Sequence, residues 1–519
     1  MAGPAPSASL APGLRRNMVT ICAMTATIMQ ALDTTIANVA LPYMQGTLSA
    51  SQDQINWVLT SYIVAAAIMT APVGWIANRF GRKRIFILCS GGFTIASVLC
   101  GLAQDIDQMV LFRLLQGVFG AALVPLSQAV MLDSYALHER AKAMSIWGMG
   151  VMMGPIMGPS LGAWLTETYS WHWVFFVNLP FGFFTVLGLM VFMDETRKDL
   201  NLRFDWFGFA ALAVAIGSLQ LALDRGEQLG WLESNEIVAE FIISAVGFYY
   251  FFAHSFTTAK PFIQFALFKD KNFVTGCIFM AVMGLVLYST MALASPYLQN
   301  VIGYPIITAG VLLASRGCGT FVAMMLVGRL MRYIEARTLI VSGLGLTALS
   351  LFYMTGWTDQ TGVPEIVSWS IIQGFGFGLV FVPLSTVAFL TLPNQLRTDG
   401  TSMLTLMRNV ASSIGISIVI SQLTEGSRRS YAILNEHINP FNHAIQMPDV
   451  RRLIDLSTDA GRAMADTMLK AQAQIISFSH DYQMVTLFIL CSIPLAIMIG
   501  STKAALRKQA AGPEQAVLE

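Results

Sequence analysis

The sequence has few charged residues, and its basic and acidic residues nearly balance. Only 12% of its 519 residues are Asp, Glu, Lys or Arg, whereas 55% are hydrophobic, and the mean hydropathy is +0.61. Soluble domains carry about 25% charged residues, so this composition excludes an ordinary soluble protein. The 31 basic and 30 acidic residues provide no basic field for nucleic acid. The lipid bilayer is therefore the expected solvent.

Signatures of redox, metal and catalytic chemistry are also missing. The six cysteines all fall within apolar segments and show no C-x-x-C spacing, which indicates small packing residues. We find no HExxH motif, Walker loop, cluster of histidines or Ser/His/Asp set in the sequence. Neither an enzyme nor a bound cofactor is predicted, and a membrane enzyme or sensor is the least favoured class.

Long apolar segments make up most of the chain. A membrane-spanning helix needs roughly 20 predominantly apolar residues. The sequence lacks the 10-residue alternation of a transmembrane barrel, so the spans are predicted to be helices. Fourteen are expected, at 18–41, 55–77, 85–103, 108–131, 143–165, 173–193, 204–223, 237–257, 273–296, 306–331, 338–356, 365–391, 402–423 and 482–502.

The basic residues predict the orientation of these spans. One alternating set of linkers holds 21 of the 31 Lys and Arg residues, and the short loops of the opposite set contain only Arg225. Basic residues concentrate in cytoplasmic loops, so both termini are predicted to be cytoplasmic. The segment 424–480 has six basic residues and falls outside, where its length weakens the rule. Its stretch from Pro448 to Ile475 has helical spacing.

An internal repeat divides the chain into two halves. LLQGVFGAALVPLS at 114–127 resembles IIQGFGFGLVFVPLS at 371–385, and the segments that begin at Val73 and Val327 match in the same order. Two parallel six-helix halves can alternate the exposure of a site between them by rocking, although duplication can also simply build a stable bundle. The predicted units are a disordered cytoplasmic tail (1–16), an N-terminal half (17–195), two inserted spans (196–260), a C-terminal half (261–503) with an extracytoplasmic loop (424–480), and a second cytoplasmic tail (504–519).

Asp33 and Arg113 are charged residues inside predicted spans, where charge is rare and usually functional. Asp33 lies about 16 residues into the first span, ~24 Å from its cytoplasmic end at ~1.5 Å per residue. Arg113 lies just below the outer end of the fourth span, so the two charges are predicted to reach similar depth and to pair. If Arg113 turns away, Asp33 should take up a proton, which would link protonation to conformation. The alternative is a purely structural ion pair.

Two further motifs are rich in glycine. The fifth span contains GVMMGPIMGPSLG, whose small residues allow close helix packing and whose prolines are expected to bend the helix. Its candidate residues are Gly150, Gly154, Pro155, Gly158, Pro159 and Gly162. The linker after the second span contains GWIANRFGRKR, which predicts a tight turn with arginines that contact helix ends and carboxylates. Its candidate residues for a cytoplasmic gate are Gly74, Asn78, Arg79, Gly81 and Arg82.

Four polar residues within other predicted spans are candidates to face a central cavity. Arg316 and Arg408 lack an acidic residue in the same segment, and they are expected either to attract an anionic substrate or to make structural hydrogen bonds. Gln116 and Gln373 occupy matching positions in the repeat. Frequent Met and Phe, 29 and 33 in number, suit a cavity for apolar ligands, though most must face lipid or core.

These motifs together resemble the major facilitator superfamily, in particular its fourteen-span drug:proton antiporters of the EmrB and QacA type. LDTTIANVALP around Asp33, RLLQG around Arg113 and the two glycine motifs carry the likeness, which covers nearly the whole chain and is closest to the EmrB type. The loop motif of this family usually has an acidic residue where this chain has Asn78. The resemblance implies proton-driven export of hydrophobic toxic compounds across a bacterial inner membrane. It also implies a periplasmic adaptor of the EmrA kind and an outer-membrane channel as partners, with 424–480 as a candidate docking surface.

A proton-coupled multidrug exporter is therefore the leading hypothesis. A proton-coupled transporter dedicated to a single metabolite is the alternative, because the Gly-Pro motif argues for export but not for a broad range of substrates.

Overall fold

The computed structural model describes residues 12–136, 139–196, 198–199, 202–258, 261–439, 442, 443, 447 and 455–498. Within these residues every regular element is helical, as predicted. The end of the predicted tail 1–16 is helical, because α1 begins at Pro12, before the predicted first span at 18–41. Residues 1–11 and the predicted tail 504–519 lie outside the described part of the chain.

The N-terminal half and the inserted pair follow the predicted order. The helices of the half are α1 (Pro12–Thr47), α2 (Gln52–Thr70), α3 (Val73–Phe80), α4 (Arg82–Gly101), α5 (Ile106–Gly120), α6 (Leu123–Ser134), α7 (Arg140–Thr168), α8 (Trp173–Phe176) and α9 (Asn178–Phe192). The inserted helices are α10 (Trp206–Leu229), the short η2 (Trp231–Glu233) and α11 (Asn235–Thr257).

The rest of the described chain is also helical. Its elements are η3 (Phe265–Lys269), α12 (Lys271–Pro296), η4 (Tyr297–Val301), α13 (Ile306–Leu330), α14 (Ala336–Met354), α15 (Val363–Val387), η5 (Asn394–Leu396), α16 (Arg397–Glu436), α19 (Asp459–Ser492) and η6 (Ile493–Met498).

Up to twelve of the fourteen predicted spans qualify by length and apolar composition among the described residues. Eleven helices pass alone, and α2 with α3 forms a twelfth as a pair bent by 56°. The bend falls at Pro72, whose missing N–H interrupts the helical hydrogen bonding. Helices α7 and α19 occupy the fifth and fourteenth predicted positions outside this set, α7 being rich in glycine and α19 beginning with a polar stretch.

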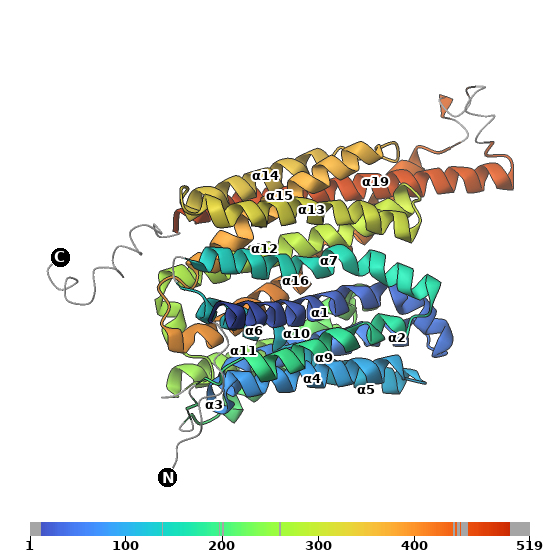
Figure 1. Ribbon diagram of the computed structural model, residues 1–519. Helices are drawn as coiled ribbons and strands as arrows, with labels where there is room; N and C mark the ends of the chain where they lie inside the picture. The colour runs from blue at the N-terminus through green and yellow to red at the C-terminus, as the bar shows by residue number, and fades with distance from the viewer. Residues whose placement is uncertain are drawn as a thin grey trace, which may run out of the picture.

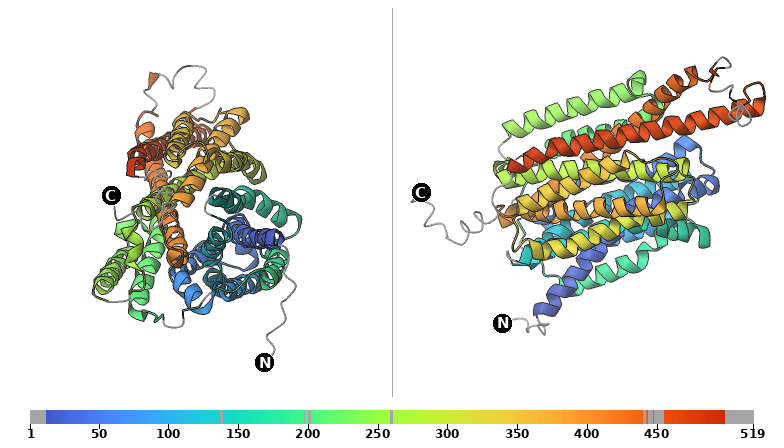
Figure 2. Two further views of the ribbon diagram at one scale, coloured as in Figure 1. Left: turned by 60° about the vertical axis from the view of Figure 1, so that its left-hand side comes forward. Right: turned by 90° about the horizontal axis from the view of Figure 1, so that it is seen from above.

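The helices lie side by side in one bundle, and the start of α1 and the end of α19 lie at the same end of it (Figures 1 and 2). An even number of crossings gives this result. At the opposite end, α16 and α19 extend beyond the other helices as a pair (Figure 1). The predicted loop 424–480 is therefore largely helical, because α16 continues to Glu436 and α19 resumes at Asp459. We call these two extensions, 424–436 and 459–480, the helical hairpin.

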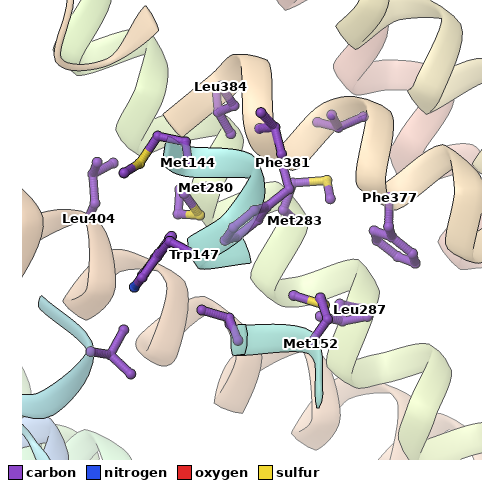
Figure 3. Packing of buried hydrophobic residues seen from close by; sticks show 14 of the residues in the cluster. Met144, Trp147, Met152, Met280, Met283, Leu287, Phe377, Phe381, Leu384 and Leu404 are labelled. Atoms are coloured by element: carbon purple, nitrogen blue, oxygen red, sulfur yellow. The ribbon is translucent and has the colours of Figure 1, made fainter. Parts of the chain in front are cut away.

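The two halves meet along α7, which packs against α13 and α15 of the C-terminal half. Methionine and aromatic side chains fill this contact: Trp147 of α7 stacks on Phe381 of α15 with ring centroids 5.8 Å apart, and Met280 and Met283 of α12 lie beside them (Figure 3). Helix α10 of the inserted pair also joins the halves, since it contacts both α2 and α16.

Candidate functional site

Asp33 is fully buried at the centre of a polar cluster within the N-terminal half. Its carboxylate accepts hydrogen bonds from Arg113 Nη1 at 2.8 Å, Gln116 Nε2 at 2.8 Å and Asn178 Nδ2 at 3.2 Å. The side chains of Asp33 and Arg113 are 0% and 1% exposed. The ion pair that the sequence predicts is therefore present, and three donors offset the loss of water around the carboxylate.

Arg113 makes further hydrogen bonds around Asp33. Its Nε donates to the carbonyl oxygen of Val58 at 3.0 Å, and Nη1 also reaches Gln116 Oε1 at 2.8 Å. The guanidinium carbon lies 4.3 Å from the ring centroid of Tyr62, within the range of a cation–π contact. A guanidinium held by α2, α5 and the rings around it is rigidly placed opposite Asp33.

One member of this cluster lies elsewhere than predicted, and two others were not predicted. Gln116, predicted to face a cavity, is 0% exposed and bridges the two charges instead. Asn178 of α9 and Tyr62 of α2 were not predicted. Asn178 could have been noticed as a lone amide near the start of the sixth span, because a buried amide needs a partner.

The glycine motif of α7 packs directly on α1, the helix that carries Asp33. A Cβ atom added at Gly154 would lie 2.2 Å from the backbone of Ala31, and one at Gly158 would lie 2.0 Å from Thr35 Oγ1. The glycines thus permit backbone contact, and Thr35 Oγ1 donates to the carbonyl of Gly154 at 3.0 Å. Gly162 faces Ile36 on the same side, whereas Gly150 has more room. Helix α7 continues as one helix through Pro155 and Pro159.

An ion-pair bridge closes the end of the bundle that carries α3. Asp133, at the end of α6, binds Arg82 at the start of α4 and accepts a hydrogen bond from Arg397 Nη1 of α16 at 2.7 Å. One carboxylate thus joins the N-terminal half to the C-terminal half. Arg82 was predicted to contact a carboxylate, but neither Asp133 as its partner nor Arg397 as the second cation on that carboxylate was predicted.

Beside this bridge, position 78 carries Asn where an acidic residue is usual, and Asp399 of the other half lies next to it. Asn78 Nδ2 lies 3.5 Å from Asp399 Oδ2 in the first turn of α16. A Cβ atom at Gly74 would lie 2.7 Å from the Cα atom of Asp399, so only glycine allows this approach. Gly81 turns the chain between α3 and α4 with φ +96°, in the left-handed region that favours glycine. Arg79 contacts the carbonyl of Leu202 and the ring of Trp75. We call Asn78, Arg82, Asp133, Arg397 and Asp399 the latch.

Arg316 and Arg408 border two small cavities on the far side of α7, between the halves. One cavity contains Arg316 of α13, and the other contains Arg408 of α16. The fourth cavity candidate, Gln373, does not line either of them. It is 0% exposed, and neither of its amide atoms makes a hydrogen bond within the described residues.

A known protein family matches most of this chain. Residues 23–416 match the model of the Major Facilitator Superfamily. The chain belongs to this superfamily. Its all-helical major facilitator fold is the one predicted.

Curated relatives and a solved structure agree with this assignment. The multidrug export protein EmrB of Escherichia coli (strain K12) is 35% identical over 434 residues, which cover 83% of this chain and 84% of that protein. The fatty acid resistance protein FarB of Neisseria gonorrhoeae is 32% identical over 426 residues, which cover 82% of this chain and 84% of that protein. A bacterial homologue of the human lysosomal transporter Spinster, solved facing inward and unoccupied, has a TM-score of 0.55 at 17% identity, with 93% of this chain and 98% of that chain covered. At that identity the solved structure shows the fold alone.

Proposed function

We propose that this protein is a proton-coupled exporter of hydrophobic compounds, and that Asp33 is its proton-coupling residue with Arg113 as the partner. The supporting observation is the buried ion pair between the two, held by hydrogen bonds inside one half. The similarity to the export protein EmrB supports the direction of transport and the range of substrates. Its role is transport across a bacterial inner membrane, without enzymatic chemistry.

Protonation of Asp33 would change the forces on two helices at once. A neutral carboxyl group no longer attracts Arg113, and the desolvated guanidinium would then favour a position with other acceptors or water. Asp33 lies on α1, and α1 is in backbone contact with α7 through Gly154 and Gly158. Helix α7 in turn packs against α13 and α15 of the other half. Gain or loss of a proton at Asp33 can therefore bias the angle between the halves.

The latch would hold the cytoplasmic side closed. This assignment rests on the basic linkers gathered at the end that carries α3, which the positive-inside rule places in the cytoplasm. In this structure the bridge from Arg82 through Asp133 to Arg397 is made, which supports a closed cytoplasmic end. Gly74 allows α3 to approach Asp399 closely, and Gly81 makes the turn between α3 and α4. Arg79 holds α3 against the linker that follows α9.

The test is dye efflux from proteoliposomes under an imposed pH gradient. Asp33→Asn should abolish gradient-driven transport while the protein still inserts and elutes as one species in size-exclusion chromatography. Asp107→Asn, which removes an exposed carboxylate at the start of α5, is the matched control and should transport normally. Undiminished antiport by Asp33→Asn would remove the coupling role from this residue.

A substrate panel in the same assay separates the leading function from its alternative. A multidrug exporter moves several unrelated dyes under the gradient, whereas a transporter dedicated to one metabolite moves none of them. The cavities between the halves favour the multidrug function, because methionine and phenylalanine side chains adapt to ligands of different shape.

The helical hairpin is our candidate for docking a periplasmic adaptor of the EmrA kind, which would connect to an outer-membrane channel. The hairpin is held together by Tyr431, whose hydroxyl donates to Asp466 at 2.7 Å, and by Ser477, which donates to the carbonyl of Leu423 at 2.9 Å. Its projection beyond the bundle makes it accessible to a partner (Figure 1).

Shortening the hairpin should separate assembly from transport. Replacing residues 431–466 with a short Gly-Ser linker is expected to abolish adaptor capture and drug resistance in cells. The same variant should retain dye transport in proteoliposomes, because the deletion leaves the Asp33 cluster and the latch intact. An equal loss in both assays would argue against a docking role.

A further inference from the structure

A cavity distinct from the two described above lies at the end of the bundle that carries α3, next to the latch. Its volume is about 520 Å³, within the range of roughly 300–1,000 Å³ that is typical of small-molecule sites. Its walls include Trp75 of α3, Asp205 just before α10, Ser255 near the end of α11, Phe262 of the linker before η3, and Asp399 of α16. We call this space the linker cavity.

Three parts of the chain enclose the linker cavity. Helix α3 belongs to the N-terminal half, Asp205 and Ser255 to the inserted pair, and Asp399 to the C-terminal half. Most of the lining residues lie in linkers between the predicted spans, so a ligand would reach the cavity from water. None of the described residues that line it also lines the cavities beside α7. It is therefore a separate site.

Asp399 brings to this cavity a carboxylate without a cation. The side chain is partly buried, and within the described residues it makes no ion pair and one hydrogen bond, the long one from Asn78 Nδ2 at 3.5 Å. Gly74 packs directly against it, and the nearby Arg82 is bonded to Asp133 instead. A carboxylate that has lost water without gaining a cation is costly in free energy, and an incoming cation would recover part of that cost.

The other charged residues of the described lining are either satisfied or exposed. Asp205 pairs with His254 Nε2 at 2.9 Å and accepts hydrogen bonds from the backbone N–H groups of Gly208 and Phe262. Arg203 is exposed, where water and salt screen its charge. Asp399 is therefore the charged group that gains most from a ligand.

Aromatic side chains make up much of the apolar wall. Trp75, Phe262 and Phe265 line the cavity. Phe204 packs against two of them, with its ring centroid 4.5 Å from that of Trp75 and 5.6 Å from that of Phe262. Aromatic faces attract organic cations, and sites for quaternary ammonium ligands are built from several such rings.

Ser255 adds a polar group without a partner. It is 2% exposed, and its hydroxyl makes no hydrogen bond within the described residues. A ligand with an N–H or carbonyl group would supply one. A metal ion fits less well, because hard cations prefer several oxygen ligands and the described residues contain no group of three or more His, Cys, Asp or Glu side chains that could hold one. One carboxylate, several rings and one hydroxyl favour an organic cation.

We propose that the linker cavity is a regulatory site for an aromatic organic cation, separate from the transport path. Asp399 balances the positive charge, and the rings of Trp75, Phe262 and Phe265 cover the apolar groups. The ligand touches both halves and the inserted pair at once, so it stabilises the arrangement with the latch closed and slows export. Binding at this site is independent of the proposed export function, and only the effect on transport rests on that function.

Two probes of the same shape test the site on the full-length protein in neutral maltoside micelles at pH 8. The cation is (2-dansylaminoethyl)trimethylammonium, and the neutral probe, N-(3,3-dimethylbutyl)dansylamide, has a carbon atom in place of the charged nitrogen. Dansyl emission rises in apolar surroundings, and micelles without protein are the blank. The wild type should bind the cation about tenfold more tightly than the neutral probe, as expected for one charged partner.

Asp399→Asn should remove this preference, because it should weaken binding of the cation about tenfold and of the neutral probe by less than about twofold. Asp194→Asn is the matched control. It removes an exposed carboxylate at the same end of the bundle that does not line the cavity, and it should leave both affinities unchanged. Equal affinity of the wild type for the two probes, or a preference that persists in Asp399→Asn, would overturn the proposal.

Phe265→Leu provides a test that leaves the latch intact. Loss of one aromatic face should weaken binding of the cation roughly threefold more than binding of the neutral probe. This comparison decides the matter even if Asp399→Asn does not fold. Equal weakening of both probes would contradict recognition of the positive charge by the rings.

Efflux measurements test the effect on transport. In proteoliposomes the cation should slow gradient-driven dye efflux and the neutral probe should not, and the concentration for half inhibition should rise about threefold in Phe265→Leu. Efflux that the bound cation leaves unchanged would overturn the regulatory role. Binding is measured without a gradient, so a wild type that moved no dye would refute the export function and leave the binding result standing.

Discussion

At the scale of single residues, the protein stabilises a buried charge with hydrogen bonds from several helices in place of water. Asp33 has three donors from α5 and α9, and Arg113 has acceptors on α1, α2 and α5. The sequence predicted the two charges because charge in an apolar span is conspicuous. It did not predict Asn178, because a single amide in a span adds little to any pattern.

Arg113→Gln should destabilise the protein more than removal of both charges. The single substitution leaves Asp33 buried without its cation, which costs roughly 3 kcal/mol when it stays ionised. We expect a lower Tm at pH 8 for Arg113→Gln and partial recovery in the double variant Asp33→Asn/Arg113→Gln. Both should be inactive in transport, so Tm and efflux are measured in parallel. A double variant less stable than Arg113→Gln would contradict this account.

At the scale of helices, one side of α7 carries glycines in place of larger side chains. Its glycines allow backbone contact with α1, and the four-residue spacing made this motif visible in the sequence. Which neighbour the glycines face could not be predicted, because spacing along one helix says nothing about the partner. The segment 424–480 was predicted as an extracytoplasmic loop with helical spacing over 448–475, because its polar residues look unlike a span. The described residues 459–475 are helical, as that spacing indicates, and they pair with the end of α16 beyond the bundle.

Gly154→Ala and Gly150→Ala form a matched pair on α7. The added methyl group at Gly154 would meet the backbone of Ala31 at 2.2 Å, whereas the nearest atom to the one at Gly150 is 3.6 Å away. We expect Gly154→Ala to push α7 from α1, to reduce gradient-driven efflux about tenfold and to lower Tm. Gly150→Ala should behave like the wild type. Similar activity in the two variants would show that close contact between α1 and α7 is not needed.

At the scale of the whole molecule, two halves are held at one end by charges of opposite sign. The repeat in the sequence predicted the halves, and the basic linker predicted part of the latch. Asp133 and Asp399 escaped prediction because each lies at the end of a helix, where an acidic residue is ordinarily solvated. Only the packing of α16 against α3 and α6 reveals that they join the halves.

Asn78→Asp should open the latch. A carboxylate would replace the amide that now lies 3.5 Å from Asp399, and like charges at that distance repel. A cysteine placed at Gly74 would be too crowded to report this, so we suggest a cysteine at Ala77 in a background without native cysteines. Its labelling by a membrane-impermeant maleimide should become faster in Asn78→Asp. The reciprocal pair Asn78→Asp/Asp399→Asn should restore slow labelling, and a failure to do so would rule out direct repulsion.

The inserted helix α10 has a mechanical consequence. It is bonded to the N-terminal half where Thr60 binds Asp224, and to the C-terminal half where Gln220 donates to Ser413 at 2.8 Å. Asp224 and Gln220 lie one turn apart on α10. A rotation of one half relative to the other would therefore either move α10 with it or break one of these two hydrogen bonds. We expect the inserted pair to limit how far the two halves can rotate.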